Sequence, residues 1–235
     1  MSMFWKVPAF MALTATVLTA CGSSVPEAQA DVVRAQARST AARRPVLFVH
    51  GYNSSGSVWT TMITNFKKDG WTDAQLFSWS YDTTRSNTVT ADLIRQKVDA
   101  ILAQTGASKV DIISHSMGGL SSRYYLKNLG GDIKVDAWVS LGGPNHGTNF
   151  ANACADPSCI EMREGSTFLG SLNSTDETPG NVRYGTWWSP CDEIINPDQS
   201  VLLSGATNTQ TTCLSHSQLY QNSLVYTQVR DFVSR

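Results

Sequence analysis

The chain has 235 residues, of which 41% are hydrophobic, and its formal net charge at pH 7 is -1. A chain of this length can bury a full core, so one domain behind a short leader is the expected organisation. The near-neutral charge provides no basic field for nucleic acid, which excludes nucleic acid as an expected partner.

The first 30 residues have the pattern of an export signal. Residues 7–20 are apolar and follow Lys6, and this stretch is too short to span a bilayer but is typical of a signal peptide. Two processing sites compete. Ala-Gln-Ala at 28–30 would release a secreted protein. Leu-Thr-Ala-Cys at 18–21 resembles a bacterial lipoprotein box, in which a lipidated Cys21 would tether the protein to the membrane of the cell envelope.

Residues 31–44 are rich in Ala, Arg and Gln, which predicts an N-terminal arm, and the folded domain then spans 45–235. In chain order we expect strands at 45–50, 75–79, 110–113, 135–141, 183–188 and 201–206, and helices at 58–68, 92–105, 120–129 and 217–233. This alternation predicts an α/β fold with a mainly parallel sheet and helices on both faces. In such sheets, reacting groups gather at the carboxyl ends of the strands.

Residues 110–119 carry the clearest sign of chemistry. An apolar strand leads into a small-x-Ser-x-small sequence at 114–118, and helical spacing follows it. A sharp turn from strand to helix lifts a serine hydroxyl clear of the backbone, which predicts Ser116 as a nucleophile. Ser114 replaces the usual first glycine but is still small. The alternative is a helix N-cap, in which Ser114 or Ser116 accepts a bond from the amides of the first turn.

A serine nucleophile needs a base, and the chain has four histidines. His216 lies between the last strand and the last helix, where the base falls in the hydrolase order of nucleophile, acid and histidine. His50 and His115 are sequence neighbours of the oxyanion loop and the nucleophile, so packing and loop hydrogen bonds are their expected roles. His146 follows the strand at 135–141 and is the weaker candidate for the base.

The acid should follow a strand between the nucleophile and the histidine, where it fixes the imidazole tautomer and stabilises the imidazolium. Asp192 stands at such a strand end. Asp198 is its competitor, and Asp156 and Asp176 lie in a segment that offers less rigid support. A surface or turn carboxylate is the alternative role for Asp192.

Two backbone amides should form an oxyanion hole, one on the residue after the nucleophile and one on the loop after the first strand. Met117 and Tyr52 occupy these positions, and His50-Gly51 makes the turn that aims the second amide. An ordinary turn glycine is the alternative for Gly51.

The segment 142–182 is rich in Gly, Asn, Ser and Thr and has neither a helical nor a strand period. Its one short apolar patch lies at Phe168, Leu169 and Leu172. Because the segment starts at the end of a core strand, we expect an insertion that lies over the active-site end of the sheet.

Apart from Cys21, four cysteines remain, an even set that suits an oxidising compartment. Four cysteines allow three connectivities, and we favour Cys154 with Cys159 and Cys191 with Cys213. Free buried thiols are the alternative. The second bridge would join the acid loop to the base loop, so we hypothesise that it sets the geometry of the triad as well as stability.

Four segments share a likeness to one family. They are Pro-Val-Leu-Phe-Val-His-Gly at 45–51, Lys-Val-Asp-Ile-Ile-Ser-His-Ser-Met-Gly-Gly at 109–119, Tyr-Tyr-Leu-Lys-Asn-Leu-Gly-Gly at 124–131 and Leu-Gly-Gly at 141–143. Together they resemble the small secreted bacterial lipases of the lipase class 2 group, including the minimal Bacillus lipases, which also tolerate a small non-glycine residue at the first elbow position. The insertion is longer than in the minimal members.

The resemblance implies an α/β-hydrolase fold. It also implies a triad of Ser116, Asp192 and His216, with the amides of Tyr52 and Met117 as the oxyanion hole. The function expected from it is that of an exported triacylglycerol lipase or esterase, which hydrolyses carboxylic esters through an acyl-enzyme. We expect this enzyme to be a monomer that needs neither a metal nor an organic cofactor.

Two alternatives stay open: a polyester or polyhydroxyalkanoate depolymerase with the same triad, and a non-catalytic surface protein on a hydrolase scaffold. Because the insertion lacks a long amphipathic helix, we expect esters of short to medium chain length and weak interfacial activation. Candidate acyl-chain contacts, for each of which ordinary packing is the favoured alternative, are Trp79, Tyr81, Trp187, Trp188, Phe168 and Leu169.

Overall fold

A computed structural model describes residues 43–235. The predicted leader, both of its processing sites, Cys21 and the arm up to residue 42 lie outside the described residues. None of the helices formed by residues 43–235 is long and apolar enough to cross a membrane.

The domain is built on one six-stranded sheet in the order β2-β1-β3-β4-β5-β6. Every neighbouring pair of strands is parallel. The strands are β1 (Val46–Val49), β2 (Leu76–Ser78), β3 (Val110–His115), β4 (Val135–Leu141), β5 (Arg183–Trp188) and β6 (Thr207–Gln210). Because all strands run the same way, the loops that follow β1, β3, β4 and β5 meet at one end of the sheet.

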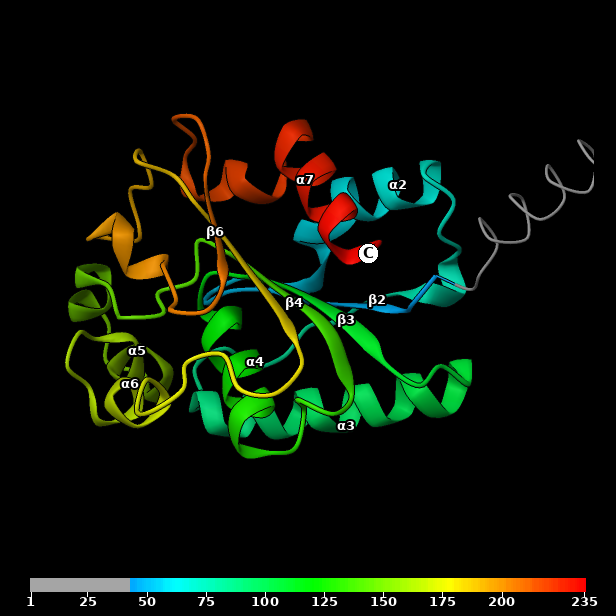
Figure 1. Ribbon diagram of the computed structural model, residues 1–235. Helices are drawn as coiled ribbons and strands as arrows, with labels where there is room; N and C mark the ends of the chain where they lie inside the picture. The colour runs from blue at the N-terminus through cyan, green and yellow to red at the C-terminus, as the bar shows by residue number, and fades with distance from the viewer. Residues whose placement is uncertain (1–42) are drawn as a thin grey trace, which may run out of the picture. The chain divides into compact units, whose positions relative to one another are not determined.

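Two pairs of helices cover the two faces of the sheet (Figure 1). The helices are α2 (Thr60–Lys68), α3 (Asn87–Thr105), α4 (Met117–Asn128), α5 (Pro157–Met162), α6 (Thr167–Leu172) and α7 (Ser223–Val233). Helices α3 and α4 lie on one face, and α2 and α7 lie on the other. Short 3-10 helices occur at Gly56–Trp59, Asp73–Gln75, Asn149–Ala153, Asp198–Val201 and His216–Tyr220.

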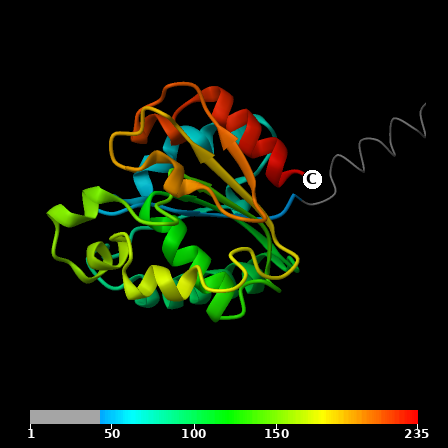
Figure 2. The same ribbon diagram turned by 60° about the vertical axis from the view of Figure 1, so that its left-hand side comes forward.

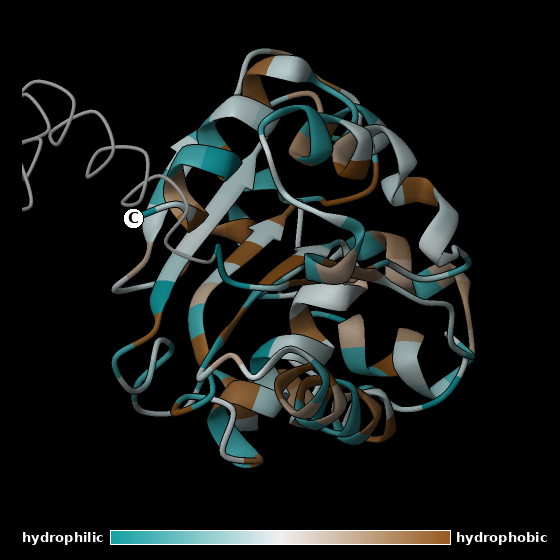
Figure 3. Ribbon diagram, turned by 90° about the vertical axis from the view of Figure 1, so that its right-hand side faces the viewer, coloured by the Kyte–Doolittle hydropathy of each residue, from teal (hydrophilic) through white to brown (hydrophobic). Residues whose placement is uncertain are grey.

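The alternation of side chains along β1 explains the two layers. Val46 and Phe48 belong to the core formed with α2 and α7, whereas Leu47 and Val49 belong to the core formed with α3 and α4. All four side chains are fully buried. The apolar residues of the central strands lie between the two helix layers, as the brown segments in Figure 3 show. This arrangement is the three-layered α/β organisation that the sequence predicts.

The insertion contains more regular structure than the sequence suggests. Helices α5 and α6 have six residues each, which is too short for a helical period to stand out. They lie next to each other at one edge of the domain (Figure 1; Figure 2), where the first residues of α3 and α4 also lie. The insertion therefore covers the end of the sheet at which β1 and β3 finish.

Two predicted elements are wrong in the last third of the chain. The predicted strand at 201–206 is a turn-rich loop, and the sixth strand is instead Thr207–Gln210, an edge strand without buried residues. The Asn208 side chain accepts a hydrogen bond from the amide of Leu203 and donates one to its carbonyl, and these bonds hold the loop in place. The predicted helix at 217–233 is interrupted, because the side chain of Asn222 accepts bonds from the amides of residues 224 and 225 and starts α7 afresh.

Candidate active site

The predicted nucleophile stands at a strained turn between β3 and α4. Ser116 has φ 55° and ψ -133°, a conformation that a non-glycine residue adopts at a cost of about 1–3 kcal/mol. Gly118 is needed here, because a Cβ atom at this position would lie 2.5 Å from the carbonyl oxygen of His50. Ser114 fits at the first elbow position, since its buried hydroxyl donates to the carbonyl of Val139 at 2.6 Å.

The predicted acid and base lie in direct contact. Asp192 follows β5 and His216 opens the 3-10 helix before α7, and His216 Nδ1 is 2.8 Å from Asp192 Oδ2. The side chain of Asp192 is 1% exposed. Its other oxygen, Oδ1, accepts hydrogen bonds from the amides of Ile194 and Ile195 at 2.9 and 3.0 Å. A carboxylate held in this way keeps the proton on His216 Nδ1 and leaves the lone pair on Nε2.

Ser116 and His216 line the same pocket, which has a volume of ≈ 290 Å³. His216 Nε2 is buried and has no hydrogen-bond partner in the described part of the chain. The Ser116 hydroxyl makes no hydrogen bond to it there, and catalytic hydrogen bonds of this kind often tighten only when substrate is bound. A buried imidazole nitrogen without a partner is available as a proton acceptor.

The two predicted oxyanion residues flank the serine. Gly51 lies so close to the nucleophile that a Cβ atom there would be 2.7 Å from Ser116 Cβ. Tyr52 follows Gly51 and lines the pocket, and Met117 is the buried first residue of α4. Among residues 43–235, neither the Tyr52 amide nor the Met117 amide donates a hydrogen bond. Two amides beside the serine are therefore free to bind a developing negative charge.

Comparison with known proteins identifies the family of the chain. The family model described as Lipase (class 2) matches residues 43–231. The chain belongs to the class 2 lipase family. The likeness seen in the sequence is thereby confirmed.

Curated relatives of this class 2 lipase include triacylglycerol lipases. The one from Pseudomonas fragi is 26% identical over 112 residues, which cover 47% of this chain and 38% of the relative. The one from Pseudarthrobacter phenanthrenivorans is 41% identical over 59 residues, which cover 25% of this chain and 18% of the relative. The matched segments thus span well under half of the length of these relatives.

Solved structures share the fold of this class 2 lipase at low sequence identity. A Bacillus licheniformis lipase in its mature form has a TM-score of 0.74 and 19% identity, and the match covers 83% of this chain and 94% of that chain. Aspergillus fumigatus lipase B has a TM-score of 0.70 and 18% identity, with 84% and 54% covered. These structures confirm the α/β-hydrolase fold.

None of the other three histidines of this class 2 lipase contacts Asp192 in the part of the chain that the structure describes. His115 packs against the imidazole of His216, with 4.4 Å between ring centroids, and its Nε2 atom is 3.0 Å from the carbonyl oxygen of His216. Burial lowers the pKa of His115 well below its usual value, so His115 stays neutral beside the base. His50 stacks on Tyr81, and His146 is exposed and lies 2.7 Å from Glu177.

The competing acids do not reach His216. The Asp198 carboxylate accepts a bond from the amide of Gln199, and Asp176 accepts one from the amide of Thr178. Asp156 binds the hydroxyl of Tyr52. Among the four aspartates considered from the sequence, only Asp192 contacts the imidazole of His216.

The pocket walls are not the residues expected from the sequence. The apolar side chains that line the pocket belong to Tyr52, Phe150, Met162, Ile194, Ile195 and Tyr220. None of the six candidate acyl contacts is among the residues that line it. Three of these candidates have the packing roles that were the favoured alternative. Trp187 is 2% exposed in the core, Tyr81 stacks on His50, and Phe168 stacks on Tyr124. Ile194 and Ile195 lie two and three residues after the acid, and this short distance in the chain is the one signal for them in the sequence.

Gly142 is a site residue that sequence reasoning missed. It follows β4 with φ 56°, and a Cβ atom there would lie 3.1 Å from Asp192 Oδ2 and 3.2 Å from His216 Cε1. A side chain at this position would therefore push into the acid–base pair. The Gly-Gly sequence directly after a core strand could have indicated that no side chain fits at this position.

Both favoured disulfides are present. Cys154 is bonded to Cys159 within the insertion, and Cys191 is bonded to Cys213. The second bridge joins the residue before Asp192 to the loop that leads to His216. Ser189 supports the same junction, because its hydroxyl donates to the carbonyl of Leu214 at 2.6 Å and accepts from the amide of Leu214 at 2.8 Å.

Proposed function

We propose that this class 2 lipase is an exported serine hydrolase that cleaves carboxylic esters, a triacylglycerol lipase or esterase, through an acyl-enzyme on Ser116. The observation that carries the proposal is the contact between His216 and Asp192, 24 residues apart in the chain, in the pocket that Ser116 also lines. The strained conformation of Ser116 supports it, because strain of this kind persists mainly at functional sites.

In the proposed mechanism, His216 Nε2 takes the proton of the Ser116 hydroxyl as Oγ attacks the ester carbonyl. The amides of Tyr52 and Met117 hold the oxyanion of the tetrahedral intermediate. The alcohol leaves with the proton from His216, and the acyl group stays on Ser116. Water then loses a proton to His216 as it attacks the acyl carbonyl. His216 returns this proton to Ser116 Oγ as the bond to the acyl group breaks, which releases the acid and restores the serine. Asp192 stabilises the imidazolium in both steps.

Secretion is the proposed location, and its support is the pairing of the cysteines. Four cysteines of the described chain form two disulfides, and such bonds persist in oxidising compartments outside the cytosol. The alternative is a lipid anchor on Cys21 at the cell envelope. The intact mass of the mature protein distinguishes them, because a lipidated Cys21 and a start at Asp31 give different masses. We also propose that the enzyme acts as a monomer.

We propose esters of short to medium chain length as substrates. The pocket volume of ≈ 290 Å³ supports a limited acyl chain. Helices α5 and α6 are six residues each, too short to form a long amphipathic lid. We therefore expect a rate that rises smoothly as the substrate concentration passes its solubility limit. A large jump in rate at that limit would contradict this part of the proposal.

The function is tested with nitrophenyl esters of increasing chain length, given to the wild type and to Ser116→Ala. The wild type should turn over the shorter esters, and the variant should lose this activity while it keeps its thermal unfolding midpoint. Ordinary ester turnover by Ser116→Ala would refute the proposal. Films of polyester and of polyhydroxyalkanoate belong in the same panel, because a depolymerase would prefer them to the soluble esters.

A further inference from the structure

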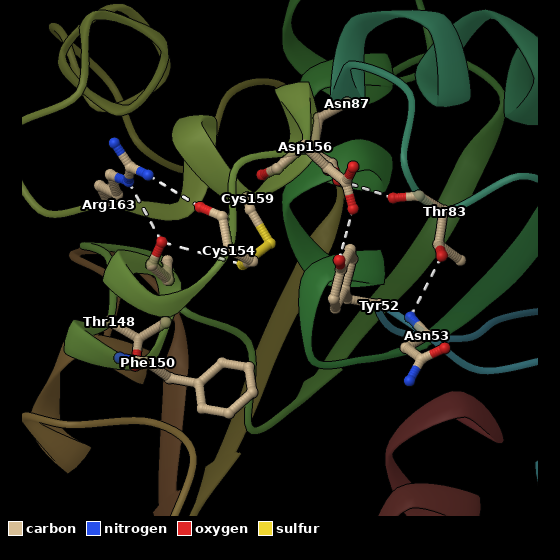
Figure 4. Close-up of a disulfide and its surroundings, with 12 residues drawn as sticks. Tyr52, Asn53, Thr83, Asn87, Thr148, Phe150, Cys154, Asp156, Cys159 and Arg163 are labelled. Carbon is tan, nitrogen blue, oxygen red and sulfur yellow. Dashed lines mark hydrogen bonds between the residues drawn. A yellow bond between two sulfur atoms is a disulfide. The ribbon is translucent and has the colours of Figure 1, made fainter.

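The loop closed by the first disulfide, residues 154–159, touches the proposed oxyanion hole. We call it the disulfide loop. The hydroxyl of Tyr52 donates to Asp156 Oδ2 at 2.5 Å, and this bond raises the pKa of Tyr52. Figure 4 shows the carboxylate of Asp156 pointing to the Tyr52 hydroxyl beside the sulfur atoms of Cys154 and Cys159. The side chain of an oxyanion residue is thus bound by a carboxylate of the insertion.

Bonds around the disulfide loop hold Asp156 in place. The disulfide closes the loop around it, and Arg163 donates to the carbonyl of Cys154 at 2.8 Å and to that of Ala151 at 3.1 Å. Ser158, which is fully buried, donates to the carbonyl of Thr83 at 2.6 Å. These bonds fix the position of the Asp156 carboxylate.

The residue after Tyr52 is fixed to the same support. The amide of Asn53 donates to Thr83 Oγ1 at 3.1 Å, and Asn53 has φ 49°. Thr83 therefore binds both Asn53 and Ser158 and connects the turn to the insertion. With its side chain bound by Asp156 and the following peptide bound by Thr83, the backbone of Tyr52 has little freedom to rotate. The direction of the Tyr52 amide follows from these two contacts.

The insertion also reaches the second oxyanion residue. The side chain of Met117 packs in one apolar cluster with Cys159 and Met162 of α5. Glu161, on the same helix, binds the amide of Asn87 at 2.6 Å and so joins α5 to the start of α3. The insertion is thus attached to the site by hydrogen bonds and by apolar packing.

We propose that Asp156 and the hydroxyl of Tyr52 are positioning residues, whose bond aims the Tyr52 amide at the developing oxyanion. The disulfide loop is then a fixed part of the oxyanion hole and not a lid that leaves it. This inference rests on the proposed function, because it assigns the Tyr52 amide to the transition state of ester hydrolysis.

The test is a double-mutant cycle in the full-length protein with Tyr52→Phe, Asp156→Ala and the double variant. Loss of a whole oxyanion donor lowers turnover by about 100- to 1,000-fold, so a donor that is only misdirected should lower kcat by about tenfold. KM for nitrophenyl butyrate should change less than about twofold, because the effect arises in the transition state. The double variant should equal either single variant, since both remove one bond.

Two further readouts separate positioning from folding. The rate at which diethyl nitrophenyl phosphate inactivates the enzyme should fall in parallel with kcat, because this reaction also develops charge in the oxyanion hole. Asp156→Asn keeps an oxygen that accepts the Tyr52 hydroxyl, so it should restore most of the kcat that Asp156→Ala loses. It also provides a conservative variant that keeps the loop intact.

Tyr226→Phe is the matched control. Tyr226 donates to Asp69 at 2.5 Å, the same kind of bond at the same distance, and neither residue lines the pocket. Tyr226→Phe should lose about as much thermal stability as Tyr52→Phe does, but it should keep kcat within about twofold of the wild type. The comparison shows whether a lost tyrosine–aspartate bond affects turnover through stability alone.

The inference is overturned if Tyr52→Phe and Asp156→Ala both keep the kcat of the wild type, or if their effects multiply in the double variant. It is also overturned if Tyr226→Phe lowers kcat as much as they do. Failure of the proposed function has a different signature, since Ser116→Ala would then retain ester turnover.

Discussion

The two ends of the sheet are built on opposite principles. At the carboxyl end, Ser116 has a strained backbone and His216 Nε2 is buried without a partner. At the amino end, the charged residues are paired with one another. The strained serine and the unpartnered imidazole nitrogen thus lie where the proposed chemistry takes place, whereas the ion pairs of Arg44 and Arg183 lie at the opposite end of the sheet.

The amino end joins both termini of the described chain to the sheet. Arg44 lies 3.3 Å from Asp111 and 2.8 Å from Asp136, and Arg183 lies 2.7 Å from Asp136. The Asp111 side chain is 2% exposed and also accepts a bond from the amide of Ala137 at 3.0 Å. Arg44, which the sequence assigns to the arm, donates to the carbonyls of residues 233 and 235 and is therefore bound into the domain.

The comparison predicts that substitution of a triad residue at the carboxyl end reduces turnover far more than stability, that loss of the neighbouring disulfide affects both, and that substitution at the amino end affects stability alone. Three changes test this, beginning with the largest effect.

Asp192→Asn should give the largest effect. The neutral amide cannot stabilise the imidazolium and favours the wrong tautomer of His216, so kcat should fall by about 1,000- to 10,000-fold. Steady-state kinetics with nitrophenyl butyrate measure the fall. Asp198→Asn is the control, because the only bond that its carboxylate makes within residues 43–235 is to the neighbouring amide of Gln199. Equal activities for these two variants would contradict the assignment of the acid.

Replacing both Cys191 and Cys213 with serine should lower turnover less than Asp192→Asn does, and it should also lower stability. Removing the closure of this loop should lower stability by about 3 kcal/mol, which urea unfolding measures. If the bridge also holds Asp192 against His216, kcat at low temperature should fall several-fold as well. Full turnover at low temperature with only a lowered unfolding midpoint would remove the geometric role.

Asp111→Asn should leave turnover unchanged and alter how stability depends on pH. Burial raises the pKa of Asp111 to about 7, whereas it titrates near 3.8 when unfolded. Ionisation therefore favours the unfolded chain, and stability from this group is full below about pH 4 and is lost as the pH rises to about 7. The wild type should lose stability relative to the variant across this window, by at most about 1.4 kcal/mol per pH unit.

Urea unfolding of both proteins between pH 4 and pH 8 checks this prediction. A difference in stability that stays constant with pH, or that changes in favour of the wild type as the pH rises, would contradict it. A large loss of turnover in Asp111→Asn would contradict the separation of the two ends.

Much of the fold could be predicted because the central strands are mostly apolar. Residues 46–49 alternate between the two cores, and in β3 Val110 and Ile112 belong to one core and Ile113 to the other. Their apolar run is visible without structure. The edge strand β6 was missed because it has no buried residues to produce a pattern. The break before α7 depends on one side chain, Asn222, whose capping bonds do not disturb the apolar spacing on either side.

The triad of the site could be predicted, because the order of its residues along the chain is typical of hydrolases. Ser116, Asp192 and His216 follow the order and the strand ends of a hydrolase, so the contact of Asp192 with His216 and the pocket shared by His216 and Ser116 could be expected. The pocket walls could not, because Phe150 and Met162 come from an insertion without a period. The bond between Tyr52 and Asp156 joins residues 104 apart in the chain, so no local sequence pattern predicts it.

The most direct test of the account is covalent labelling by an alkyl fluorophosphonate, followed by intact mass and peptide mapping. We expect one adduct on the wild type, located at Ser116, and a label that forms far more slowly in His216→Ala. A wild type that takes up no label at Ser116, or a His216→Ala variant that is labelled at the rate of the wild type, would contradict it.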